Sequence, residues 1–204
     1  MTAPAVYLAS KSPRREDLLR QLGVEFTSLR LRESTGRELD IIEVARDAEP
    51  ARHYVERLAR TKATVGWHRM LQRGLAPRPV LGADTEVVLD DRIFGKPKDA
   101  SDAGRMLTLL SGCTHQVLTA VALCWEGNTV AEISTSSVTF RTLSADEIER
   151  YVSTGEPLDK AGGYAIQGRA ATFVQRIDGS HSGIMGLPLY ETAAALAGIG
   201  FPVL

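Results

Sequence analysis

The sequence has 204 residues, 44% of them hydrophobic, which suits one domain or one domain with two lobes and excludes a disordered chain. Its 24 basic and 25 acidic residues give a net charge of −1, so no general attraction draws it to nucleic acid or an anionic membrane. The two cysteines form no CxxC pair, the four histidines are scattered, and no run of about 18 apolar residues occurs. We therefore expect a cytoplasmic protein that contacts neither nucleic acid nor membrane.

The first half of the chain combines short apolar strands with two helices. Ser12 and Pro13 suit the N-cap and first position of a helix that Gly23 ends. Residues 32–49 are polar and charged with few apolar anchors, which predicts a mobile flap containing a short helical or extended piece. The other expected elements are a strand at 5–9, a strand at 24–31, a helix at 50–66, a strand at 80–89 and its short partner at 92–94.

The second half predicts more strand than helix. Four apolar residues between positions 103 and 110 have helical spacing, and Ser144 with Glu147 forms a capping box at the start of a later helix. The expected elements are a helix at 101–111, strands at 115–125 and 129–142, a helix at 144–153, a glycine-rich loop at 155–169, a strand at 172–177 and a helix from 188. This irregular order predicts a mixed α/β or α+β architecture, which we assign to a single domain over residues 1–204.

The segment from Ser10 to Arg15 is the strongest candidate for anion binding. The sequence has neither a G-x-G-x-x-G fingerprint after a strand nor a P-loop, so a phosphate would have to be bound in another way. Arg14 and Arg15 lie in the first turn of a helix, where they oppose the helix dipole. A docked phosphate would reverse that penalty, because free N–H groups and arginine forks both bind phosphate oxygens. The alternative is a pair of solvated surface arginines.

Two charged residues fall on apolar patterns. Lys62 lies on the buried stripe of the 50–66 helix, so it either extends to the edge of the core or points into a polar site. Asp84 follows an apolar strand, and strand alternation places it on the same face as Glu86. A buried carboxylate is costly unless it is paired or bound to metal, which suggests a magnesium ligand or a base. The alternative is a strand-end aspartate that hydrogen-bonds the next turn.

Two loops supply further polar groups. Lys96 follows the short strand at 92–94, and Gln167 lies in the glycine-rich loop at 155–169. The Gln167 amide offers both a donor and an acceptor, as recognition of a nucleobase requires. Each loop could also be an ordinary solvated turn. Together with the cations above, these groups suit a phosphate ester that carries a nucleobase.

Several segments together resemble the Maf family of nucleoside triphosphate pyrophosphatases. They are LASKSPRREDLLRQLGV, ERLARTKA, VLGADTEVVLDDRIFGKPKD, MLTLLSGCTHQVLTAVAL, EPLDKAGGYAIQG and GLPLYET, in the family's order. The resemblance implies an elongated central mixed sheet flanked by helices, with two lobes and a cleft between them. It also implies hydrolysis of a nucleoside triphosphate between its α and β phosphates, with a divalent cation (Mg²⁺ or Mn²⁺). Family members often form dimers, so a homodimer is one expected assembly.

The same resemblance implies roles for individual residues. Asp84 matches the family's catalytic, metal-binding aspartate. The positions that match those around the phosphates and metal are Ser10, Arg15, Lys62 and Lys96. Three further positions, Arg14, Thr85 and Gln167, have the residues of the branch that hydrolyses dTTP and UTP.

The sequence departs from the family pattern at two places. The family often has an acidic pair shortly after the second strand, and here Glu33 is the expected counterpart that would supply a metal ligand. Glu86 stands where the family usually has valine or isoleucine. The alternative to an enzyme is a non-catalytic nucleotide-binding regulator of septum formation, and the presence of Asp84 with the full set of cations favours the enzyme.

Overall fold

The computed structural model describes residues 5–31, 41–201 and 203, whose strands form one mixed sheet. The strand order is β2-β1-β3-β5-β6-β7, and β4 pairs with β3. Among the described strands, only β1 makes parallel pairs, with β2 and β3, and the remaining pairs are antiparallel. The strands are β1 (Ala5–Leu8), β2 (Glu25–Ser28), β3 (Val80–Leu89), β4 (Arg92–Phe94), β5 (Thr114–Trp125), β6 (Asn128–Phe140) and β7 (Val174–Asp178).

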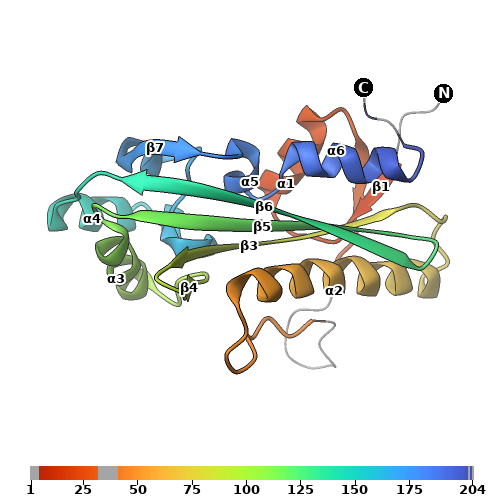
Figure 1. Cartoon of the computed structure of the whole chain (residues 1–204), viewed down its shortest axis with the longest axis horizontal. Coiled ribbons are helices and arrows are strands. Elements are labelled where there is room, and N and C mark those ends of the chain that lie inside the picture. Colours follow the sequence, from red (N-terminus) through yellow and green to blue (C-terminus); the bar gives the residue numbers. More distant parts are fainter. Residues whose placement is uncertain (1–4, 32–40, 202, 204) are drawn as a thin grey trace.

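Helices cover both faces of this elongated sheet (Figure 1). Figure 1 shows α2 along one side of the long strands, α1 and α6 on the opposite side, and α3 and α4 together at one end. The α-helices are α1 (Pro13–Gln21), α2 (Ala51–Gln72), α3 (Ala100–Leu110), α4 (Ala145–Val152), α5 (His181–Met185) and α6 (Leu189–Gly198). None of the helices in the described part of the chain is long and apolar enough to cross a membrane. The predicted mixed sheet flanked by helices is confirmed.

The hydrophobic core has separate clusters on the two faces of the sheet. Strand alternation along β5 sends Ala120 and Ala122 into the cluster beneath α2, and Val121 and Leu123 into the cluster beneath α1 and α6. A third cluster, around Phe140, fills the end of the molecule that contains α3 and α4. All three clusters therefore pack against the sheet.

Helix α2 is longer than the sequence predicts, because Gly66 does not end it. A Cβ atom at Gly66 would lie 2.7 Å from Val80 Cγ1, so the glycine permits close contact between helix and strand. On the strand side, a Cβ at Gly82 would lie 2.5 Å from both the Ala59 carbonyl oxygen and the Ala63 nitrogen. This close approach of α2 to β3 brings Lys62 next to Asp84.

The remaining differences lie at strand ends, such as that of β2, which spans Glu25–Ser28 and not 24–31, and in irregular segments. Helix α5 (His181–Met185) is absent from the prediction, because five residues are too few to show a helical period. The glycine-rich loop contains the short 3₁₀ helices Glu156–Asp159 and Ala161–Gly163, and a third, Arg169–Phe173, delays the start of β7 to Val174. Of the predicted flap, residues 32–40 lie outside the described residues, and 41–49 form neither helix nor strand.

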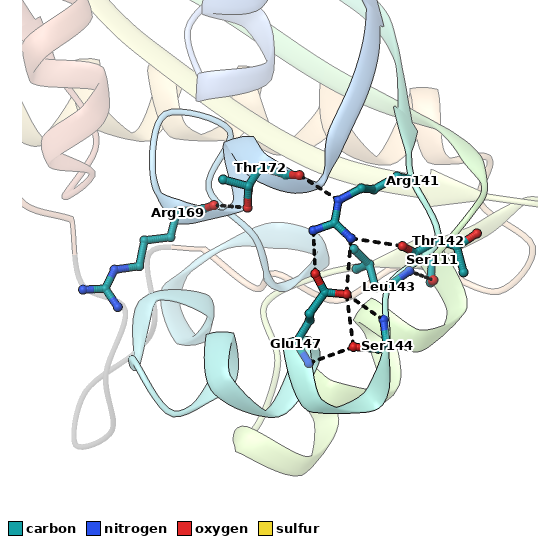
Figure 2. Close-up of polar contacts among 8 residues, drawn as sticks. All are labelled: Ser111, Arg141, Thr142, Leu143, Ser144, Glu147, Arg169 and Thr172. Atoms are coloured by element: carbon teal, nitrogen blue, oxygen red, sulfur yellow. Dashed lines mark hydrogen bonds and ion pairs between the residues drawn. The ribbon is translucent and has the colours of Figure 1, made fainter.

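The predicted capping box is present at the end of the molecule away from β1, where it anchors a larger network (Figure 2). Arg141 donates to both Glu147 carboxylate oxygens at 2.7 and 3.2 Å and to the Thr172 carbonyl at 3.0 Å. Glu147 also accepts from the Ser144 backbone nitrogen at 2.9 Å. The network ties the end of β6 to α4 and to the turn before β7, and Figure 2 shows the Arg169 side chain pointing away from it.

Candidate active site

A gap along one edge of β3 positions the candidate site. On that edge β1 pairs with β3 only at Val80 and Leu81, and β4 pairs with it only from Val87 to Leu89. Among the described residues no strand covers the edge between these two pairings. Asp84, Thr85 and Glu86 lie in this uncovered stretch and line a cavity of about 600 Å³. The topology of the sheet therefore opens β3 to a ligand at its most polar point.

The structure brings all the described candidate residues together around this cavity. They are Ser10, Arg14, Arg15, Lys62, Asp84, Thr85, Lys96 and Gln167. Glu33 lies outside the described residues, so its expected role as a metal ligand stays a prediction.

Lys62 points into the cavity rather than along the edge of the core. Its Nζ lies 2.7 Å from Asp84 Oδ1 and 2.6 Å from Glu43 Oε1, and only 9% of its side chain is exposed. Burial acts to lower the pKa of Lys62, but the negative charges of Asp84 and Glu43 outweigh it and raise the pKa overall. Lys62 is therefore a fixed positive charge between two carboxylates.

Two buried carboxylates on β3 each retain an oxygen without a partner among the described residues. These atoms are Asp84 Oδ2 and Glu86 Oε2. Burial raises the pKa of Asp84, against the opposing charges of Lys62 and Arg15. Burial, together with the negative charge of Asp84, raises the pKa of Glu86 to about 8. Because an unpaired buried carboxylate oxygen is costly, both atoms are positioned to coordinate a cation or to hold a proton.

Arg15 is held in place by contacts from three segments of the chain. Its Nε donates to the Gly186 carbonyl at 2.8 Å, and its two terminal nitrogens donate to Ser10 Oγ at 3.1 Å and to Thr85 Oγ1 at 3.3 Å. Gly186 has φ +121°, a backbone conformation that favours glycine. A guanidinium anchored in this way can face an anion without losing further side-chain entropy.

The outer part of the cavity is formed by loops. Arg14 contacts Asp159 at 3.2 Å, and Asp159 also forms an ion pair with Lys160. Gln167 is exposed and lines the cavity from the same glycine-rich segment, and Lys96 lines it from the loop after β4. The exposed position of Gln167 leaves its amide available for a ligand.

Three features of the site were missed from sequence. Glu43 lies in a segment without any periodic pattern, and the structure places it in the site, where it lines the cavity and contacts Lys62. Burial acts to raise the pKa of Glu43, but the charge and hydrogen bond of Lys62 lower it overall. Tyr164 lines the cavity and contacts the buried His115 Nε2 at 2.8 Å. The Gly186 carbonyl that holds Arg15 follows the short helix α5, and a backbone group leaves no signal in side-chain patterns.

Charge and shape together define the ligand class. The described lining includes six basic side chains (Lys11, Arg14, Arg15, Lys62, Lys96 and Lys160) and four acidic ones (Glu43, Asp84, Glu86 and Asp159). An excess of cations around buried carboxylates suits a polyanion, such as a chain of phosphates, more than a neutral molecule. The fold and site thus define a protein that binds a phosphorylated small molecule.

Comparisons with known proteins place this chain in a family. A family profile described as Maf-like protein matches residues 5–199, and the chain belongs to that family. A protein of Aromatoleum aromaticum named dTTP/UTP pyrophosphatase is 54% identical over 199 residues, which cover 97% of each chain. A Nitrosomonas europaea protein with the same name is 50% identical over 206 residues, 100% of each chain. Among solved structures, the Staphylococcus aureus Ham1 protein covers 67% of this chain and 71% of its own at 10% identity and a TM-score of 0.41.

Proposed function

We propose that this protein hydrolyses dTTP and UTP between the α and β phosphates. Water attacks, the phosphoanhydride bond breaks, and the products are a nucleoside monophosphate and pyrophosphate. The observation that carries the proposal is the contact of Lys62 with Asp84, beside Arg15, in a cavity lined by an excess of cations. The names of relatives that match the chain over nearly its whole length supply the substrate. Such an activity removes these nucleotides, or modified pyrimidine nucleotides, from the cellular pool.

The cations are proposed to bind the triphosphate. Arg15 presents a planar guanidinium that fits two phosphate oxygens, while Lys62 and Lys96 act as point charges from α2 and from the loop after β4. Phosphoryl transfer depends mainly on positioning and on neutralising charge. Cations held by other protein groups are effective here, because they need not reorganise when charge shifts to the leaving group.

The residues of the site fit a divalent cation. Two buried carboxylate oxygens, on Asp84 and Glu86, lack partners among the described residues, and such hard oxygen ligands suit Mg²⁺ or Mn²⁺. Within 5–31 and 41–201 no group of three or more His, Cys, Asp or Glu side chains could hold a metal ion. Phosphate oxygens of the substrate, together with the predicted ligand Glu33, would complete the ligand set. When bound, the cation supplies charge neutralisation and lowers the pKa of water.

Asp84 is the proposed catalytic residue. An aspartate at its ordinary pKa near 3.9 is a weak base at neutral pH. Burial raises the pKa of Asp84, while Lys62, donating to Oδ1, favours the ionised form. The free Oδ2 is then the atom that can orient the attacking water or accept its proton.

Base recognition is assigned to Gln167, with Arg14 and Thr85 nearby. Uracil and thymine present an imide edge in which two carbonyl acceptors flank an N–H donor. The amide of Gln167 can pair with part of this edge in either direction, because it offers one donor group and one acceptor. The exposed position of Gln167 on the cavity wall suits this role.

A substrate panel tests the proposal directly. The purified protein is incubated with Mg²⁺ or Mn²⁺ and each of dTTP, UTP, dCTP, CTP, ATP, GTP and 7-methyl-GTP, and release of pyrophosphate is measured. The Asp84→Asn protein serves as the matched inactive control. We expect dTTP and UTP to give the highest kcat/KM. Binding of nucleotides without release of pyrophosphate would contradict the proposal and favour a non-catalytic regulator.

A further inference from the structure

Gln167, the residue assigned to the base, lies at the tip of a tight turn. The Gly168 nitrogen donates to the Ala165 carbonyl oxygen at 3.0 Å, which closes a β-turn over these residues. Of the two central residues, Ile166 is buried in the core, whereas Gln167 is exposed and lines the cavity. An amide at such a tip has a defined position only if both ends of the turn are fixed.

Both ends of this turn are fastened to one pair of side chains, Tyr151 on α4 and Glu156. At the start of the turn, the Ala165 nitrogen donates to Tyr151 Oη at 3.2 Å. Directly after its end, the Arg169 nitrogen donates to Glu156 Oε2 at 3.3 Å. Tyr151 Oη donates to Glu156 Oε1 at 2.9 Å, so the two anchoring side chains also hold each other. The backbone on either side of Gln167 is therefore attached to a single hydrogen-bonded unit.

The hydroxyl of Tyr151 is the central atom of this unit. A backbone N–H only donates, so Tyr151 Oη accepts from Ala165, and its one proton is directed to the Glu156 carboxylate. Tyr151 and Ala165 are each 4% exposed. Without the hydroxyl, the Ala165 N–H would lose its partner in a buried place, which is costly. The start of the turn therefore depends on this hydroxyl.

The end of the turn lies directly against the Glu156 carboxylate. A Cβ atom at Gly168 would lie 2.4 Å from Glu156 Oε1 and 2.6 Å from Glu156 Cδ. Gly168 has φ −107°, so no left-handed backbone conformation requires glycine here. The glycine instead leaves space for the carboxylate. An alanine at this position would displace the end of the Glu156 side chain without straining the backbone.

We propose that Tyr151 and Glu156 are positioning residues that hold the turn 165–168 so that Gln167 contacts the base of the nucleotide. Neither side chain belongs to the described lining of the cavity, so both act through Gln167. The inference rests on the proposed function for its substrate. The attachment of the turn to the two side chains does not depend on that function.

The test compares dTTP with abasic 2-deoxyribose 5-triphosphate, which has the same sugar and phosphates but no base. The ratio of their kcat/KM values measures what the base contributes, and in the wild type it should be at least about tenfold. Tyr151→Phe should lower kcat/KM for dTTP by about tenfold and change that of the abasic compound by less than about twofold. A merely structural role would lower both values together, and that result would overturn the inference.

Two further variants show whether the effect passes through Gln167. In Gln167→Ala, addition of Tyr151→Phe should change kcat/KM for dTTP by less than about twofold, because the group to be positioned is already absent. Losses that add in the double variant would contradict the inference. Gly168→Ala keeps the Tyr151 hydroxyl and displaces Glu156, so it should show the same selective loss on dTTP. This variant tests the inference even if Tyr151→Phe does not fold.

Ser144→Ala is the matched control for loosening of α4. Ser144 caps the helix that carries Tyr151, and its side-chain hydrogen bonds are with Glu147. The control should therefore keep the wild-type ratio between dTTP and the abasic compound. If Ser144→Ala lowers that ratio as much as Tyr151→Phe, loosening of α4 is the cause and the inference is wrong.

The inference also fails if the wild type prefers dTTP to the abasic compound by less than about twofold. Absence of hydrolysis of every triphosphate by the wild type would instead refute the proposed function. In that case the same variants are compared through dissociation constants of dTMP and 2-deoxyribose 5-phosphate, measured by calorimetry. Tyr151→Phe should then weaken binding of dTMP alone, and a wild type that binds the two compounds equally would overturn the inference.

Discussion

Two cation–carboxylate pairs in this protein have the same contact distance and different surroundings. Lys62 lies 2.7 Å from Asp84 beneath the cavity, and each side chain is 9% exposed. Arg141 lies 2.7 Å from Glu147 in the network of Figure 2, where the side chains are 40% and 28% exposed. The distance alone would suggest equivalent interactions, yet the pKa values of the two carboxylates shift in opposite directions.

The difference lies in burial and in how completely each carboxylate is hydrogen-bonded. Hydrogen bonds from Arg141 and Ser144 lower the pKa of Glu147 to about 2, and both its oxygens have partners. Burial raises the pKa of Asp84, and its Oδ2 has no partner among the described residues. A carboxylate whose two oxygens are both hydrogen-bonded within the protein has a structural role. A buried carboxylate with one oxygen that lacks a hydrogen-bond partner is available to bind a ligand, a metal or a proton.

The largest expected effect on activity comes from removing the negative charge of Asp84 from the buried ion pair. Asp84→Asn keeps the size of the side chain, but its amide cannot serve as an anionic ligand or base. We expect kcat to fall by at least about 100-fold, the scale typical of losing an acid–base group. Lys62 keeps Glu43 as a partner, so the fold should persist, as circular dichroism and thermal unfolding would show. Turnover near that of the wild type would mean that Asp84 is only a structural partner of Lys62.

A substitution at Gln167 tests whether polar groups at the outer rim act on the ligand. Gln167→Glu places a carboxylate against a base carbonyl, which should lower kcat/KM for dTTP and UTP by one to two orders of magnitude, or about 1.4–2.8 kcal/mol. The ring of 7-methyl-GTP carries N–H donors and a positive charge, so its relative kcat/KM should rise. The rise should be larger when Arg14 and Thr85 are also exchanged. Equal losses on both substrates would indicate that Gln167 supports the loop instead of contacting the base.

Sequence patterns predicted the parts of the site that lie on regular elements. The apolar run before Asp84 and the spacing of Lys62 both follow from strand and helix periods, and the structure places these residues in contact. The same patterns left the direction of Lys62 open. That direction depends on how closely α2 approaches β3, and the approach depends on Gly66 and Gly82.

Other parts of the site depend on packing between distant segments. Glu43 lies in a polar segment with no period, and its contact with Lys62 is a tertiary interaction. His115 alternates along β5 like any core residue, and only the fold pairs it with Tyr164, 49 residues away. In the sequence, Thr119 is an ordinary strand threonine, and only the structure shows its hydrogen bond to the Gly183 carbonyl. Backbone acceptors and cross-strand hydroxyls carry no sequence signature, so such positions could not be predicted.

His115 extends the comparison to a buried group without a charged partner. It is 1% exposed, its Nε2 contacts the Tyr164 hydroxyl, and burial lowers its pKa to about 4 from an ordinary value near 6.5. Between these values the unfolded state binds more protons at this site than the folded state, so stability falls as pH falls. We expect a loss of about 1.4 kcal/mol per pH unit from this group between pH 6.5 and 4.

Urea unfolding of the wild type and His115→Gln at several pH values between 4 and 7.5 measures this contribution. The difference in unfolding free energy between the two proteins should change with pH below 6.5 and stay constant above it. Glutamine keeps a hydrogen-bonding group for Tyr164 but does not titrate. A difference that is the same at every pH would show that His115 is protonated as readily in the folded protein as in the unfolded chain.

The smallest effect is expected for a substitution in the exposed Arg141–Glu147 network. Such a substitution should change the free energy of unfolding and leave activity unchanged. The Ser144 hydroxyl accepts from the Glu147 nitrogen at 3.3 Å and caps α4, so Ser144→Ala should lower the free energy of unfolding by about 1 kcal/mol. Ser144→Thr retains a capping hydroxyl and should lose less. Both variants should keep the kcat and KM of the wild type, because the network has no free carboxylate oxygen to offer a substrate and lies outside the cavity lining. A loss of kcat in Ser144→Ala without a matching loss in Ser144→Thr would mean that the capping network and the cavity are coupled. In that case, whether both carboxylate oxygens are hydrogen-bonded would not distinguish structural from functional ion pairs in this fold.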